Sequence, residues 1–195
     1  KTFFIKVNES LDPDVFVAES GGLVCIAKAK CGLKVPQPFD VGALPPRPGH
    51  GERPAGAFLV LSWVDHQPLG AFKGDRMAEF GAALAKMHSA DFSPTHQGRY
   101  GFASVTWIGT VAQDNAWCPT WQELFHRRLA HQLKRCCAPR MASSDTGEEA
   151  AVVPTSDPAV QDLGQRVLER LGQLLAPVAE TMRPALLHGD LWIGN

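Results

Sequence analysis

Short apolar runs separated by polar or Pro/Gly-rich stretches make up the first third of the chain, a pattern typical of strands with a helix between them. Thr2–Val7 is rich in Phe and Ile, which predicts a buried strand. A helix is expected to begin at Pro13 with Asp12 as its N-cap, because apolar residues then recur at helical spacing. Extended structure resumes at 35–42, and the apolar run 57–64 (AFLVLSWV) predicts a central strand.

The rest of the chain changes to a helical period. Apolar residues three and four positions apart predict helices at about 75–89, from Trp121 to at least Leu133, and from about Val160 to Val178. The segment 142–157 is polar, small and acidic, which predicts a mobile insertion between the last two helices.

The order of these elements is strand, helix, strand, strand and then mainly helix. Such segregation of strands and helices is typical of an α+β fold. We expect two parts: a small sheet-bearing part at residues 1–64 and a larger helical part at 65–195.

Composition narrows the class of protein. The chain has 195 residues, 45% of them hydrophobic, with 19 Lys+Arg against 20 Asp+Glu. This balance gives no support to a nucleic-acid surface, and no apolar run approaches the roughly 20 residues of a membrane span.

The five cysteines include no CxxC pair, so neither a disulfide framework nor a zinc site is expected. Reduced thiols favour an intracellular protein, in the cytoplasm or a plastid. The chain does not begin with Met, and we expect it to be part of a longer protein.

Lys6 and Glu19 are the first candidates for chemistry. Lys6 interrupts an apolar strand, either as a lysine that reaches water from the strand edge or as an ammonium group held ready for an anionic ligand. Glu19 lies among apolar positions of the next helix, either as a solvent-facing carboxylate or as the partner that fixes Lys6. Each signal alone is weak.

His188, Asp190 and Asn195 carry a more specific signal, H-x-D-x-x-x-x-N, expected by chance in about one per cent of chains this long. The motif follows the apolar residues 185–187, where we expect a β-like segment leading into a loop. In kinase catalytic loops with this spacing, the Asp accepts or orients the proton of the substrate hydroxyl and the Asn binds a metal ion. Together with a strand Lys and a Glu in the next helix, the motif predicts a kinase.

The closing segment LLHGDLWIGN resembles the signature of the fructosamine/ketosamine-3-kinase family, a branch of the protein-kinase-like two-lobe fold related to aminoglycoside and choline kinases. The intervening Leu-Trp-x-Gly is more specific to the fructosamine kinases. The resemblance covers almost the whole chain outside 45–54 and 143–157, and continues in these segments: FFIKVN, VFVAESGGL, LKVPQPFDVG, FLVLSWVD, FGAALAKMHS, YGF and DNAWCPTWQELF.

The resemblance implies ATP-dependent phosphorylation of the 3-hydroxyl of a ketosamine, a ribulosamine or fructosamine, on a glycated protein lysine or a small molecule. The phosphorylated adduct then detaches, so the family acts in protein deglycation. By the same resemblance Lys6 would hold the nucleotide phosphates and Glu19 would brace it. Asp190 would be the catalytic base, His188 would support the loop, and Asn195 would bind Mg²⁺.

Two rival interpretations stay open. One is a related small-molecule kinase for an aminoglycoside, choline or homoserine, which the Leu-Trp-x-Gly and YGF segments disfavour. The other is a non-catalytic, kinase-like binding fragment. A Gly-rich phosphate loop and a second metal-binding Asp are not found in these 195 residues, so we expect impaired activity of this chain by itself. A metallophosphoesterase is disfavoured because no further His/Asp cluster accompanies the motif.

Overall fold

The computed structural model describes residues 1–9, 12–49, 52, 54–65, 76–109, 111–137, 140–141, 152–153 and 157–191. The chain divides into two compact units, each treated by itself. The first unit comprises Lys1–Gln97, Ala103–Gln113 and Ala185–Asn195, and the second comprises Gly98–Phe102 and Asp114–Pro184. The boundary expected after residue 64 stays a prediction, since residues 66–75 lie outside the described part.

A three-stranded antiparallel sheet forms the centre of the first unit. Strand β3 (Ala57–Ser62) lies between β1 (Phe3–Asn8) and β2 (Pro38–Ala43), which confirms the three expected strands and the central place of the most apolar one. Only alternate residues of β3 are buried, because the two faces of a strand alternate along its length: Ala57, Leu59 and Leu61.

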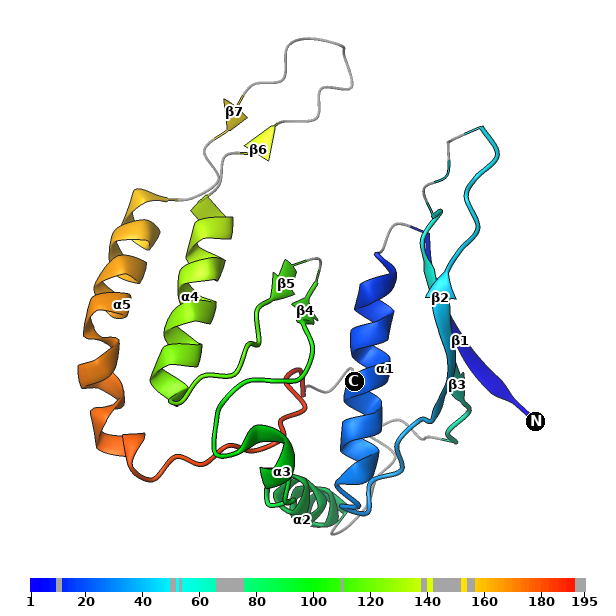
Figure 1. Cartoon of the computed structure of the whole chain (residues 1–195), viewed down its shortest axis with the longest axis horizontal. Coiled ribbons are helices and arrows are strands. Elements are labelled where there is room, and N and C mark those ends of the chain that lie inside the picture. The colour runs from blue at the N-terminus through cyan, green and yellow to red at the C-terminus, as the bar shows by residue number, and fades with distance from the viewer. Residues whose placement is uncertain are drawn as a thin grey trace. The chain divides into compact units, whose positions relative to one another are not determined.

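Helix α1 (Pro13–Lys28) covers the buried face of this sheet, as Figure 1 shows. The carboxylate of Asp12 accepts a hydrogen bond from the backbone N–H of Asp14 at 2.9 Å, so the predicted N-cap is confirmed. Phe16 enters the hydrophobic core with the buried residues of β3, and Leu23 packs against this core from one helical face.

The remaining elements of the first unit are shorter. Helix α2 (Arg76–His88) confirms the helix expected at about 75–89, and α3 (Ser93–His96) is a single turn. Strands β4 (Thr106–Ile108) and β5 (Val111–Gln113) pair as a small antiparallel ladder. Met87 is fully buried while Met77 is exposed, so the predicted apolar face of α2 is buried at its C-terminal end.

The second unit is built on two helices, α4 (Trp121–Cys137) and α5 (Pro158–Ala179), which lie side by side in Figure 1. Glycine at 164 permits a close approach, because a Cβ there would lie only 2.5 Å from Leu133 Cδ2. Both predicted helices are confirmed. The segment 142–157 lies largely outside the described residues, although β7 (Val152–Val153) pairs with β6 (Arg140–Met141).

The buried stripe of α5 differs from the expected one. Leu171 is buried, but four other apolar residues at the helical spacing that predicted this helix are exposed: Val160, Leu163, Leu174 and Val178. The helix approaches α4 closely at Gly164 and Gly172, small residues that a search for large apolar side chains overlooks. The fold as a whole is α+β, as predicted. Within the described residues, no helix combines the length and apolarity needed to cross a membrane.

Candidate functional site

Lys6 lies on the face of the sheet that α1 covers. The register of β1 with β3 sets Lys6 opposite Leu59, and residues directly opposite in an antiparallel pair point to the same face. Leu59 is fully buried in the core with Phe16 of α1. The single charged residue in the run FFIKV is therefore directed toward the helix rather than away from it.

Glu19 approaches Lys6 from α1. A spacing of three residues from Phe16 puts both side chains on the same helical face, toward the sheet. Lys6 Nζ donates to Glu19 Oε1 and to Glu19 Oε2, both at 2.8 Å. Lys6 Nζ also lies 5.5 Å from the centre of the Phe16 ring, within the range of a cation–π contact. The structure thus brings together the two residues that the sequence singled out as a possible pair.

This ion pair remains open to solvent. The Lys6 side chain is 38% exposed and that of Glu19 is 34% exposed. Both line an open hollow of about 520 Å³, together with Ile5, Val7, Asn8, Val15 and Phe16. An ammonium group has three N–H donors, and Glu19 accepts two of them, which leaves the third for an anion entering the hollow. The arrangement suits contact with a phosphate or carboxylate oxygen.

His188 and Asp190 lie near the C-terminal end of the first unit. The backbone N–H of Asp190 donates to His188 Nδ1 at 3.4 Å, so the imidazole contacts the backbone of the same loop. Gly189 between them adopts φ +88°, a conformation that glycine takes without the strain a Cβ would bring. Both side chains are exposed. The prediction of a β-like segment at 185–187 is wrong. These residues form no strand, because no neighbouring strand pairs with them in the described structure.

The predicted metal ligand Asn195 lies outside the described residues, and so does Trp192 of the Leu-Trp-x-Gly segment. Within the described ranges, no group of three or more His, Cys, Asp or Glu side chains is placed to hold a metal ion. The metal-binding role of Asn195 therefore stays a prediction that rests on the motif.

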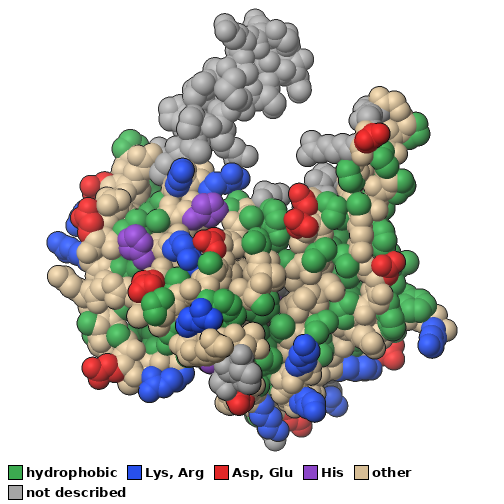
Figure 2. All heavy atoms as spheres, viewed as in Figure 1, with side chains coloured by type: hydrophobic (Ala, Val, Ile, Leu, Met, Phe, Trp, Pro, Cys, Tyr) green, Lys and Arg blue, Asp and Glu red, His purple; other side chains and the backbone are tan. Residues whose placement is uncertain are grey.

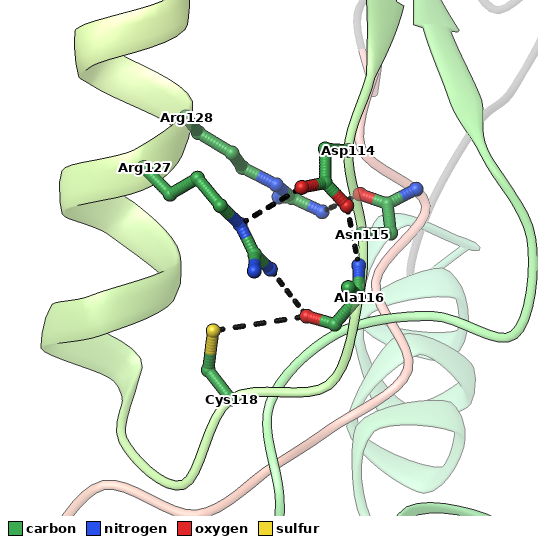
Figure 3. A network of polar contacts seen from close by, with 6 residues as sticks. All are labelled: Asp114, Asn115, Ala116, Cys118, Arg127 and Arg128. Carbon is green, nitrogen blue, oxygen red and sulfur yellow. Dashed lines mark hydrogen bonds and ion pairs between the residues drawn. The ribbon is translucent and has the colours of Figure 1, made fainter.

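A polar network at the start of the second unit was not predicted from the sequence (Figure 3). Arg127 and Arg128, adjacent on α4, both reach the loop that precedes the helix. Arg127 Nη2 donates to the carbonyl of Ala116 and its Nε lies 3.4 Å from Asp114 Oδ2, whereas Arg128 Nη2 donates to Asn115 Oδ1. The sequence contains the dipeptides Asp114-Asn115 and Arg127-Arg128, but nothing in their spacing indicates which side chain contacts which.

The network leaves one guanidinium without a carboxylate partner among the described contacts. Asn115 is buried, and its amide oxygen is a neutral acceptor for Arg128. Burial and the neighbouring charge of Arg127 lower the pKa of Arg128 from its ordinary value. Arg128 is thus held in place by the loop while its charge is only partly offset.

The segments YGF and DNAWCPTW, quoted above for their family resemblance, contact each other in the second unit. The backbone N–H of Tyr100 donates to the Cys118 carbonyl at 2.8 Å, and the Tyr100 carbonyl accepts from the backbone N–H of Cys118 at 2.7 Å. The Tyr100 ring lies 6.2 Å from that of Trp121, which in turn lies 5.7 Å from that of Phe125. Aromatic side chains from two separate segments therefore form one cluster.

Comparisons with known proteins agree on one family. The chain is 32% identical over 195 residues to the protein-ribulosamine 3-kinase, chloroplastic, of Oryza sativa subsp. indica, and 31% identical over 195 residues to that of Arabidopsis thaliana. Each alignment covers 100% of this chain but 47% and 50% of the relative, respectively. The chain thus spans about half the length of the curated relatives it matches.

A solved structure of a provisionally assigned fructosamine-3-kinase from Thermobifida fusca YX-ER1 has a TM-score of 0.65 and 26% identity, covering 99% of this chain and 55% of that one. A second, from Haemophilus somnus 129PT, has a TM-score of 0.67 at 23% identity, over 99% of this chain and 53% of that one, and shows the same fold. The fold is therefore kinase-like, as predicted. The family model for fructosamine kinase matches residues 1–195, and the chain belongs to that family.

Proposed function

We propose that the protein catalyses ATP-dependent phosphorylation of the 3-hydroxyl of ketosamines, ribulosamines or fructosamines, on glycated protein lysines or on small molecules, and so promotes deglycation. One observation carries the proposal: a chain of this family pairs a strand lysine with a helix glutamate at 2.8 Å, beside an open hollow. Two relatives named protein-ribulosamine 3-kinase support the substrate class. Their description as chloroplastic supports a plastid location, and the alternative of the cytoplasm stays a prediction.

The described residues fit the phosphates of a nucleotide at Lys6. ATP, when bound, supplies the phosphoryl group, and Mg²⁺ offsets the negative charge of its phosphates. Lys6 donates its third N–H to a phosphate oxygen, and Glu19 keeps the ammonium group directed into the hollow. Phosphoryl transfer depends mainly on such positioning and charge neutralisation, which a rigid strand provides better than a loop.

Asp190 orients the sugar hydroxyl and accepts its proton, which a poor nucleophile requires. His188 holds the loop through its contact with the Asp190 backbone and takes no proton. Asn195 binds Mg²⁺, an assignment that rests on the motif alone. The phosphorylated ketosamine then leaves, as the family resemblance implies.

Asp190→Asn in the full-length protein tests the central role, since the 195 residues by themselves are expected to have impaired activity. We expect turnover of ribuloselysine or fructoselysine to fall by about two to four orders of magnitude, with Mg·ATP affinity within about threefold of the unmodified protein. Asp162→Asn, which removes an exposed carboxylate from α5, is the matched control and should leave both quantities unchanged. Phosphate transfer is followed with labelled ATP.

Three results would overturn the proposal. Full activity of the Asp190→Asn protein would refute the assigned base. Faster phosphorylation of choline or an aminoglycoside than of ketosamines would identify a different small-molecule kinase. Absence of transfer to every acceptor would leave a non-catalytic, kinase-like binding protein.

A further inference from the structure

One face of α4 is strongly basic. Five residues define this basic face: Arg127, Arg128, His131, Lys134 and Arg135. At 3.6 residues per turn they lie within about a third of the helix circumference. Lys134 and Arg135 are exposed and the other three are half-buried. Figure 2 shows Lys, Arg and His side chains over the α4 region, with Asp or Glu side chains between some of them.

Few carboxylates offset this charge. Arg127 pairs with Asp114 at 3.4 Å, and Glu123 lies one turn before Arg127 on the same helix. Arg128 bonds the neutral amide of Asn115 instead. In the described part of the chain, no hydrogen bond or ion pair of His131, Lys134 or Arg135 is found. The basic face therefore carries four permanently charged side chains, and only two carboxylates nearby offset them.

Arg128 also has an unsatisfied donor. Its Nε is buried without a hydrogen-bond partner among the described residues, beside the like charge of Arg127. The nearby carboxylate of Asp114 offsets the charge of Arg128 only in part, and a further anion at the basic face would reduce the repulsion between Arg127 and Arg128. Loop contacts hold Arg127 and Arg128 in place on α4, whereas Lys134 and Arg135 are exposed near the C-terminal end of the helix.

We propose that the basic face of α4 is a docking surface for an acidic polypeptide segment. Arg127 and Arg135 are eight residues apart, a rise of about 12 Å, which about four residues of extended peptide span. A segment with several Asp or Glu side chains at that spacing matches the length and the sign of the face. A nucleic acid fits less well, because the chain as a whole has a net charge of -1 and so offers a long polyanion no overall excess of positive charge.

The binding does not require phosphoryl transfer, so it is measured directly. Fluorescence anisotropy follows a short, fluorescein-labelled Glu-rich peptide titrated with the whole protein at about 50 mM salt and again at about 300 mM salt. We expect saturable binding that weakens at the higher salt. The double variant Lys134→Gln/Arg135→Gln should weaken it about tenfold or more, because two of the four permanent charges are lost.

Arg166→Gln/Arg170→Gln, on the exposed side of α5, removes the same charge from the same unit and should change the affinity less than about twofold. Glutamine preserves helix propensity, so both variants are expected to fold. Equal weakening by both double variants, equal binding of the Gln-for-Glu peptide, or no binding at about 50 mM salt would overturn the proposal. Tighter binding of a single-stranded oligonucleotide than of the peptide would assign the face to nucleic acid instead.

Discussion

The pairing of Lys6 with Glu19 leads to a prediction that separates a structural role from a functional one. The perturbations are Lys6→Met, Glu19→Gln and the two combined. Lys6 Nζ lies 2.8 Å from both carboxylate oxygens, yet the two side chains keep 38% and 34% of their surface exposed. The pair therefore combines the geometry of a strong ion pair with the solvent screening of a surface pair.

Exposure decides the expected magnitude for stability. Breaking a fully buried pair costs about 3–5 kcal/mol, whereas exposed pairs contribute about 0.2–1 kcal/mol. With a third of each side chain in water, the coupling between Lys6 and Glu19 in the free energy of unfolding should be about 1 kcal/mol or less. Lys6→Met should cost somewhat more than Glu19→Gln, because it also removes the contact with the Phe16 ring, worth about 0.5–1 kcal/mol.

Nucleotide affinity should respond far more strongly. A hydrogen bond to a charged group contributes about 1.5–3 kcal/mol, so losing the Lys6 contact with a phosphate should lower Mg·ATP affinity about ten- to a hundredfold. Glu19→Gln should lower it less, since the ammonium group is kept but is less firmly oriented. This contrast between a small change in stability and a large change in binding is the mark of a ligand-binding lysine.

Urea denaturation followed by far-UV circular dichroism gives the free energies of the four proteins, and calorimetric titration gives their Mg·ATP affinities. Lys86→Met is the matched control, because it removes an exposed lysine from α2. A coupling above about 3 kcal/mol would show that the pair serves the core. Unchanged ATP affinity in the Lys6→Met protein would refute the assigned role.

Further substitutions test the fold around the site. A Cβ at position 56 would lie 2.1 Å from the Asn8 carbonyl oxygen, and φ there is +144°, so Gly56→Ala should destabilise the protein by about 3 kcal/mol or more in urea denaturation. Gly21→Ala meets nothing within 4 Å in the middle of α1 and should stabilise by about 0.5–1 kcal/mol, so the same sign for both would contradict this reasoning. Asn115→Ala removes the acceptor for Arg128 and should lower the thermal midpoint, with a cost of about 1–3 kcal/mol; an unchanged midpoint would show that water replaces the amide.

The first unit was largely predictable because its signals are local. The N-cap at Asp12, the Pro at the first helical position and the continuous apolar run at 57–64 each determine an element without reference to distant residues. The predicted importance of Lys6 and Glu19 came from residue type and chain order. Their contact itself required the three-dimensional arrangement of strand and helix.

The second unit was less predictable because its contacts depend on tertiary packing. Gly164 carries no apolar signal, yet its lack of a side chain allows α5 to approach Leu133 of α4 closely. The network of Arg127 and Arg128 depends on the path of the preceding loop, since one acceptor is a main-chain carbonyl. A carbonyl is present at every residue, so no sequence pattern indicates which one is bound.

The geometry at Lys6 depends on the strand register of β1 and on the orientation of α1 about its axis. A slip of one residue in the pairing of β1 with β3 would turn Lys6 to the opposite face of the sheet and move an apolar neighbour into its place. Glu19 and Phe16 are three residues apart on α1, so they share the helical face toward the sheet. The burial of Phe16 stabilises the orientation of α1, because a rotation of the helix about its axis would expose this core residue. The ion pair is therefore positioned by the hydrophobic core beside it, and its own attraction is too weak in water to impose that arrangement.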